Sequence, residues 1–165
     1  MVDLLGGIDY DKIKIIASSG LTTAKIVDSA GNIVSDIPLS SLRPARSESV
    51  RELSSQSISA SGKAEFEVTD TEGYSAIAVS IRAVYNASAT AGVRVRWLYS
   101  PDGVNYDSEN GAENESQYKD IAFTAGATEQ ETVIIPIFKP RVKIQVVNQD
   151  SSYAVTVDAW RTLLR

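Results

Sequence analysis

Apolar residues recur at every second position along most of this sequence, and this alternation restricts the fold more than any other feature. The run YSAIAVSIRAVY at 74–85 places isoleucine and valine on one face and alanine, serine and arginine on the other. The same period of two occurs in 92–99, 141–148 and 153–163. Such alternation of β-branched and aromatic residues is typical of half-buried strands, and no window keeps the 3.6-residue period of a helix. The sequence therefore predicts an all-β protein.

Eight strands are predicted from residue 53 onward, separated by short polar turns. They span 53–60, 63–69, 74–85, 92–99, 117–123, 131–138, 141–148 and 153–163. Eight short antiparallel strands favour two packed sheets, an antiparallel β-sandwich or jelly roll. Apolar residues on both faces place 131–138 and 141–148 near the centre of their sheets. Pro136 predicts an edge or a bulge in the first of these, because proline cannot donate to a β-ladder.

The first 52 residues are organised differently. Residues 12–17 (KIKIIA) predict one strand, and AKIVDSAGNIVSD at 24–36 predicts a hairpin with 29–32 at its tip. Serines, arginines and one proline then interrupt the pattern. We therefore predict a small N-terminal β arm at 1–38, a linker at 39–52 and a β-sandwich domain at 53–165. An arm this short can scarcely bury its own core, so we expect it to dock on the sandwich or on a neighbouring subunit.

The composition excludes several kinds of chemistry. The 165 residues include no histidine and no cysteine, and 16 Lys and Arg against 21 Asp and Glu give a net charge of −5. These absences rule out disulfides, thiolate or imidazole metal sites, cysteine nucleophiles and Ser-His-Asp relays. We expect no membrane span and no signal peptide, and the acidity of the chain argues against direct nucleic-acid binding. We expect a non-enzymatic protein without a cofactor or a membrane partner.

The segment 100–120 is the densest polar stretch, with six acids against one lysine. Asp102, Asn105 and Asp107 are spaced so that one turn could offer oxygen ligands to Ca²⁺, but the spacing of an EF-hand is missing. A pair of carboxylates for glycoside hydrolysis is a further alternative. The simplest interpretation is a long solvated loop without a metal.

Arginines occur in two groups that could bind an anion. Arg43, Arg46 and Arg51 lie in the predicted linker, and Arg94 and Arg96 lie on one face of a predicted strand. Either group could bind a phosphate or a polyanion. Either could instead contact an acidic neighbour in an assembly, such as the acidic loop of another copy. The simplest interpretation is that strand arginines face solvent and linker arginines pair with Glu48 and Glu52.

Several segments resemble small β-sandwich structural proteins of tailed phages and related proviruses, which serve as head-decoration, neck or tail components. These segments are VRVRWLYSPDGVNYDS at 93–108, the acidic loop after it, TVIIPIFKPRVKIQVVNQD at 132–150 and YAVTVDAW at 153–160. The resemblance covers roughly residues 53–165. It implies a non-enzymatic protein that forms symmetric oligomers and docks through an N-terminal arm, with no catalytic residues to carry over.

Two functions therefore compete. The leading hypothesis is a virion structural protein, assembled in the host cytoplasm, whose partners are further copies of itself, as a trimer for example, and other virion proteins. The predicted docking residues come from the arm and the linker: Ile13, Ile15, Ile26, Val27, Ile33, Val34, Arg43, Arg46 and Arg51. The alternative is a carbohydrate-binding β-sandwich module, with or without calcium, because sugars stack on aromatic rings. Its predicted residues are Tyr99, Tyr106, Tyr118 and Trp160.

Overall fold

The computed structural model divides the chain into two units, each of which is described by itself. They comprise Met1–Pro44 and Ala45–Arg165. The residues that the structure describes are 23–27, 33–38 and 46–165. Among these residues, no helix is long and apolar enough to cross a membrane.

The described part of the first unit is a β-hairpin. Its strands, β1 (Thr23–Val27) and β2 (Ile33–Pro38), pair in antiparallel fashion with one irregularity in the register. The hairpin predicted at 24–36 is therefore confirmed. Its predicted tip at 29–32 and the strand predicted at 12–17 lie outside the described residues.

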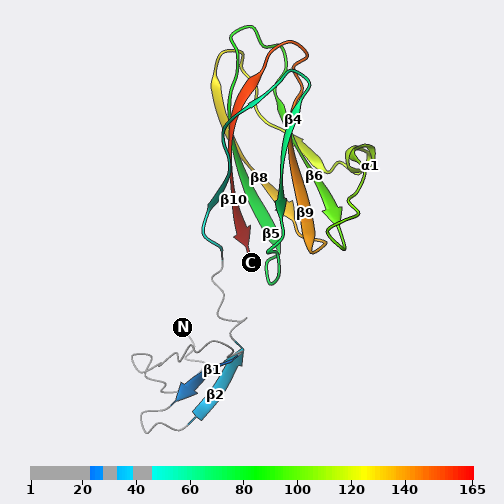
Figure 1. The fold of residues 1–165 in the computed structure, drawn as a ribbon. Helices are drawn as coiled ribbons and strands as arrows, with labels where there is room; N and C mark the ends of the chain where they lie inside the picture. The colour runs from blue at the N-terminus through cyan, green and yellow to red at the C-terminus, as the bar shows by residue number, and fades with distance from the viewer. Residues whose placement is uncertain (1–22, 28–32, 39–45) are drawn as a thin grey trace. The chain divides into compact units, whose positions relative to one another are not determined.

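The second unit is a sandwich of two antiparallel four-stranded sheets (Figure 1). Its strands are β3 (Val50–Ile58), β4 (Lys63–Val68), β5 (Ala76–Val84), β6 (Val93–Ser100), β7 (Tyr118–Asp120), β8 (Thr128–Pro136), β9 (Arg141–Asn148) and β10 (Val155–Leu164). Sheet I has the order β3–β10–β5–β8, and sheet II has the order β4–β9–β6–β7. Each strand lies within a few residues of a predicted one, so the predicted antiparallel β-sandwich is confirmed.

The strand order is that of a jelly roll. The chain pairs in a nested way, with β3 beside β10, β4 beside β9, β5 beside β8 and β6 beside β7. Two further pairings, β10 with β5 and β9 with β6, join these pairs into the two sheets. The arrangement corresponds to one long antiparallel hairpin rolled up so that its inner face encloses a core.

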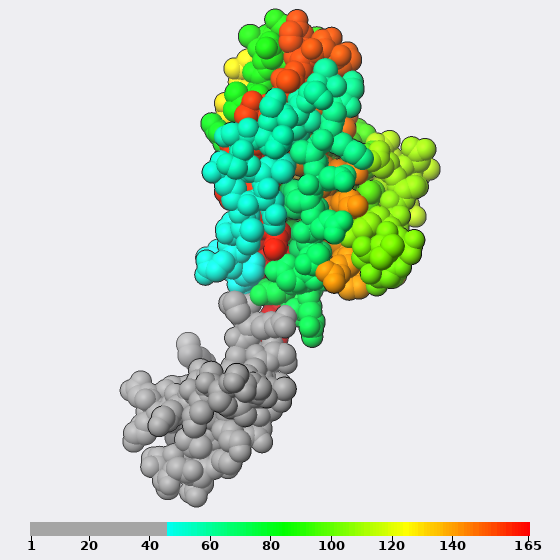
Figure 2. Space-filling model, viewed as in Figure 1, coloured from blue at the N-terminus to red at the C-terminus, as the bar shows by residue number. Residues whose placement is uncertain are grey.

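The core lies between the sheets, where the apolar half of each alternation points inward. The central strands β5 and β9 supply fully buried side chains: Ile77, Val79, Ile81, Val142, Ile144 and Val146. Burying one such side chain contributes about 1.5–3 kcal/mol. Trp97 packs against this core with partial exposure, as its phase in the alternation predicts. Figure 2 shows the side chains of β3 and β4 lying against each other along one side of the sandwich.

The sandwich begins before the boundary predicted at residue 53. Arg46 forms an isolated antiparallel bridge with Leu164, and the Ser47 N–H donates to the Leu163 carbonyl over 2.9 Å. The second half of the predicted linker therefore belongs to sheet I. The polar residues of this segment give no strand signal in the sequence. They can form the start of β3 because β3 lies at a sheet edge, where most of its side chains are exposed.

The central position predicted for 131–138 is wrong. β8 pairs only with β5 and forms the second edge of sheet I. Pro136, the last residue of β8, indicated this edge correctly, because an edge strand tolerates a missing N–H donor. The apolar run on β8 reflects contact with the core on one face and an exposed apolar residue on the other.

The segment 100–120 is not one continuous loop, because it contains the helix α1 (Glu109–Asn114). Ser108 caps this helix, and its hydroxyl accepts a backbone N–H of the first turn over 3.0 Å. Six residues are too few for a helical period to appear in the sequence. The helix depends on its cap and on contacts with sheet II, which the sequence pattern does not report.

Asp150 joins the β5–β6 loop to the β9–β10 turn at one end of the sandwich. Only 1% of its surface is exposed. Its carboxylate accepts the Thr90 N–H at 2.6 Å and those of Ser152 and Tyr153 at 2.8 and 2.7 Å. These hydrogen bonds, that of Thr90 first, hold the pKa of Asp150 well below its usual range. The β5–β6 loop and the β9–β10 turn are thereby joined.

Candidate functional site

The outer face of sheet I is a regular array of side chains, three rows of which cross β10, β5 and β8. In the register the rows are Asp158, Arg82 and Gln130; Trp160, Ser80 and Thr132; and Thr162, Ala78 and Ile134. These rows contain no lysine and no glutamate, and Ile134 is 56% exposed. These rows of the face therefore carry little charge.

Asp158 is the buried charge of this face, with 4% of its surface exposed. Its carboxylate accepts hydrogen bonds from Arg51 Nη2 at 2.5 Å, the Ser55 N–H at 2.6 Å and Arg82 Nη1 at 3.1 Å. These interactions, led by the Arg51 hydrogen bond, lower the pKa of Asp158 to about 2. A buried carboxylate stays charged only with such partners, and here two guanidinium groups and one amide supply them.

A bulge in β3 positions the Ser55 backbone N–H that donates to Asp158. The register of β3 against β10 shifts between Val157 and Ala159, so Ser54 and Ser55 both lie opposite the single residue Asp158. Ser55 adopts a φ of 46°, in the left-handed region. Such a bulge re-aims backbone groups, and this one directs the Ser55 N–H at the carboxylate.

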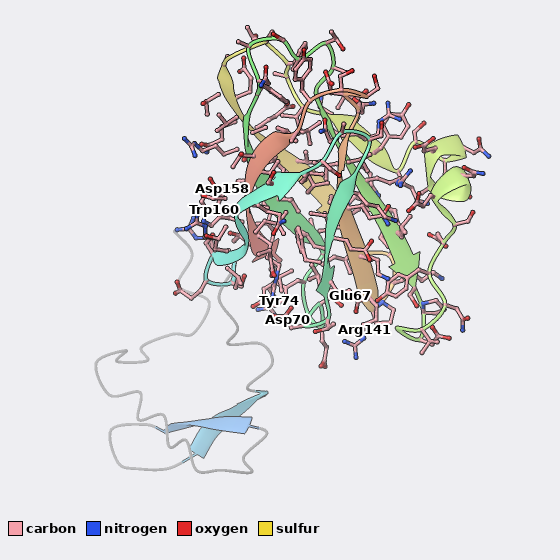
Figure 3. The ribbon with its side chains drawn as sticks, turned by 45° about the horizontal axis from the view of Figure 1, so that its top comes forward. Glu67, Asp70, Tyr74, Arg141, Asp158 and Trp160 are labelled. Carbon is pink, nitrogen blue, oxygen red and sulfur yellow. The ribbon has the colours of Figure 1, made fainter. Side chains whose placement is uncertain are left out.

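Trp160 lies beside the ion pair on the same face of β10, as Figure 3 shows for the labelled Asp158 and Trp160. The guanidinium carbon of Arg51 lies 5.4 Å from the centroid of the indole ring. Arg51 is thus held between a carboxylate and an aromatic face, which orders a long side chain at the surface. Ordered tryptophan and arginine on a face with little charge are typical of the centre of a protein interface.

A second charged cluster, on the outer face of sheet II, holds α1. Arg96 is 6% exposed and donates to Glu113 Oε1 at 2.8 Å and Gln145 Oε1 at 2.9 Å, while its Nη2 lies 2.7 Å from Glu109 Oε2. The Gln145 amide donates to Glu109 over 3.0 Å. A hydrogen bond from Lys63 is the largest cause that lowers the pKa of Glu109. Because both glutamates belong to α1, the cluster anchors the helix on β6 and β9.

The strand arginines predicted as an anion site have carboxylate partners within the chain. Arg94 donates from Nε and Nη2 to the two oxygens of Asp120, at 2.6 and 3.0 Å. Arg96 is held by the two glutamates of α1. The acidic segment therefore neutralises these arginines, an arrangement poorly suited to binding a phosphate.

The predicted docking residues fall into three places. Ile13, Ile15 and Arg43 lie outside the described residues, Ile26, Val27, Ile33 and Val34 lie in β1 and β2, and Arg46 and Arg51 lie in the sandwich. The predicted pairing with Glu48 or Glu52 is wrong for Arg51, which pairs with Asp158. Glu52 instead accepts a hydrogen bond from Arg161 Nε at 2.6 Å. Both partners come from β10, the neighbour of β3 in space but not in sequence.

The predicted calcium ligands are held by local hydrogen bonds. Asp102 accepts the N–H groups of Val104 and Asn105 at 2.9 and 2.8 Å and the Asn105 side-chain amide at 2.6 Å. The Asn105 N–H contributes most to a pKa of Asp102 well below its usual range. Asp107 accepts the Tyr99 N–H at 3.1 Å. Within the described ranges, no three acidic side chains are grouped to hold a metal.

A cleft of about 410 Å³ lies next to the start of β7, between β6 and β8. It is called the aromatic cleft below. It is lined by Trp97, Tyr99, Pro101, Asp107, Glu115, Ser116, Gln117, Pro136, Phe138 and Lys139. The rings of Tyr99 and Phe138 lie 5.6 Å apart, and the Tyr99 hydroxyl donates to the Pro136 carbonyl at 2.7 Å. Burial raises the pKa of Tyr99 to about 12, so this hydroxyl keeps its proton at neutral pH.

The four aromatic residues predicted as a glycan site do not come together. They are Tyr99, Tyr106, Tyr118 and Trp160. Only Tyr99 lines the aromatic cleft. Each of the other three rings has a cation 3.9–5.4 Å from its centroid, which occupies one face of the ring. The other rings of the cleft are Trp97, whose phase in 92–99 predicts a place in the core, and Phe138, the last residue of a predicted strand.

Comparison of the sequence with models of known protein families gives no match, and comparison with curated proteins gives none either.

Proposed function

We propose that this protein is a non-enzymatic structural component of a viral particle, a head-decoration, neck or tail protein. It associates with further copies of itself and docks on a protein lattice through its N-terminal arm. The observation that carries the proposal is the outer face of sheet I, where Asp158 fixes Arg51 beside Trp160 on a surface with little charge. A surface of this composition serves contact with another protein.

The fixed conformation of Arg51 favours association with a partner. Binding that immobilises a long side chain costs about 0.5–1.5 kcal/mol for each such side chain. Arg51 is already held by a carboxylate and an indole ring in the single chain, so most of this cost falls on folding instead. The face is preorganised for a partner.

The charges favour another copy as that partner. Arg51, Arg82 and Asp158 give the face a local charge of +1, whereas the whole chain carries −5. The remaining residues of the chain therefore carry a net negative charge, which favours their contact with this face. Complementary charge of this kind steers association and fixes its orientation.

The hairpin of the first unit favours docking by strand addition. β1 and β2 form a sheet of two strands, so each has one edge without a partner strand among the described residues. Such edges pair readily with a strand of another chain. Jelly rolls also occur in viral capsid proteins and in lectins, which is an analogy of fold alone.

Site-specific thiol labelling tests the self-association. Because the chain contains no cysteine, a Thr132→Cys variant carries one reporter on the outer face of sheet I. Val104, 79% exposed in the β6–α1 loop, gives the matched Val104→Cys control. We expect labelling of the first variant to slow at least tenfold with rising protein concentration, while the control stays constant. Equal, concentration-independent labelling of both would contradict the proposal.

The viral assignment has its own test. Quantitative mass spectrometry of particles purified from the native source should find the protein at a fixed ratio to the major shell protein. Its absence from washed particles would remove the viral part of the proposal and leave the self-association to be judged by labelling.

A further inference from the structure

The aromatic cleft combines two kinds of surface that ligand sites require. Its walls are apolar, with Trp97 and Tyr99 from β6 and Phe138 from the turn after β8. Phe138 is 72% exposed although it contacts the ring of Tyr99. Pockets that bind small molecules are lined mainly by aromatic and apolar groups, with a few polar groups that fix orientation. The volume of about 410 Å³ lies within the usual range of such pockets.

Gln117, one of the residues that line the cleft, carries an unsatisfied acceptor. Gln117 Oε1 is buried and has no hydrogen-bond partner among the described residues. The amide nitrogen of the same side chain donates to Glu115 Oε2 at 2.9 Å, which fixes the orientation of the amide. An unpaired buried acceptor costs about 1–3 kcal/mol. Because Gln117 Oε1 has almost no surface open to solvent, the side chain must turn toward the cleft before a ligand hydroxyl can donate to it and recover that cost.

The charges of the cleft select against an anion. Asp107 and Glu115 line it and are opposed by one cation, Lys139. Carboxylates accept hydrogen bonds from hydroxyl groups and repel phosphate, sulfate or carboxylate groups. The fitting ligand is therefore uncharged, donates several hydroxyl groups and presents one apolar face to an aromatic ring.

We propose that the aromatic cleft binds a neutral saccharide. The apolar C–H face of a sugar ring packs between Trp97 and Phe138, and the Gln117 side chain turns so that its Oε1 accepts a hydrogen bond from one sugar hydroxyl group. Asp107 and Ser116, which also line the cleft, accept further hydroxyl groups. The site is separate from the outer face of sheet I, and the proposal does not depend on self-association.

The two tryptophans of the chain allow a direct assay. A Trp160→Phe variant of the full chain leaves Trp97, in the wall of the cleft, as the sole fluorescent tryptophan. A printed array of neutral and anionic oligosaccharides identifies candidates, and each is then titrated while Trp97 emission is recorded. We expect saturable changes with one class of neutral glycan and none with its sulfated or sialylated forms.

Two substitutions and two controls locate the binding. Phe138→Ala should weaken binding at least tenfold, and its exposure means that the fold does not depend on it. Gln117→Ala should weaken binding about five- to tenfold, as expected for one hydrogen bond. The matched controls Val104→Ala and Tyr153→Ala lie at exposed positions that do not line the cleft and should leave affinity unchanged. The proposal is overturned if no neutral glycan changes Trp97 emission, or if both cleft variants bind as the parent does.

Discussion

Replacing Asp158 by asparagine should destabilise the sandwich and change how its stability depends on pH. Asparagine keeps the size of the side chain but removes the charge that Arg51 and Arg82 share. It also turns an NH₂ group toward donors that need an acceptor. Because the two arginine side chains are 46% and 44% exposed, water can rehydrate them in the variant. The loss is therefore smaller than for a fully buried pair.

The magnitude follows from the pKa of Asp158. The difference between its ordinary value of 3.8 and about 2 in the folded protein corresponds to about 2 kcal/mol. A carboxyl whose folded pKa is lowered contributes this stability in full above its unfolded pKa. The contribution then disappears as the pH falls from about 5 toward 2. We expect Asp158→Asn to cost about 2 kcal/mol at pH 7 and to lose less stability than the parent between pH 5 and pH 2.

Urea unfolding followed by tryptophan fluorescence and circular dichroism, at pH values from 7 to 2, measures both effects. Asp70→Asn is the matched control, because Asp70 pairs with Arg161 at 3.1 Å but has a side chain that is 59% exposed. This control should cost less than about 1 kcal/mol, as exposed pairs do. The reasoning fails if Asp158→Asn costs no more than the control, or if its stability falls with pH as steeply as that of the parent.

Three further predictions concern the helix, the core and one turn. Arg96→Met should cost about 2 kcal/mol and remove the hydrogen-exchange protection of α1, because Glu109 and Glu113 lose their main anchor; unchanged exchange in α1 would argue against this. Ile144→Ala, at a fully buried position, should cost about 3 kcal/mol in thermal unfolding. Gly126→Ala should cost about 1–2 kcal/mol in urea unfolding, because Gly126 has a φ of +75° and an added Cβ would lie 3.3 Å from a backbone atom; a stabilised variant would refute the strain.

The sequence predicts the sandwich well because the alternation is a direct consequence of burial on one face. Most strands repeat it over at least part of their length, so the strand positions follow without knowledge of pairing. The pairing itself joins β3 to β10 from opposite ends of the domain. No local pattern encodes that contact, which is why the partner of Arg51 could not be found from its neighbours in sequence.

The candidate sites could be predicted only in part. The alternation in 153–163 places Asp158 and Trp160 on the same outward face, so the sequence predicts that these two residues of the sheet I site are neighbours. The partner Arg82 and the bulge at Ser55 depend on the register, which the sequence does not state. The aromatic cleft forms where a loop, a helix end and a turn meet, and Gln117 carries no periodic signal.

The mass of the full chain in solution tests the central claim most directly. Light scattering on a size-exclusion column should give a multiple of the 17.8 kDa of one chain, with the multiple maintained or increasing as the concentration rises. An Ala78→Arg variant adds a charge to the outer face of sheet I and should return the mass to 17.8 kDa while the far-ultraviolet circular dichroism stays unchanged. A mass of 17.8 kDa for the parent at every concentration, or an unchanged oligomer in the variant, would contradict association through this face.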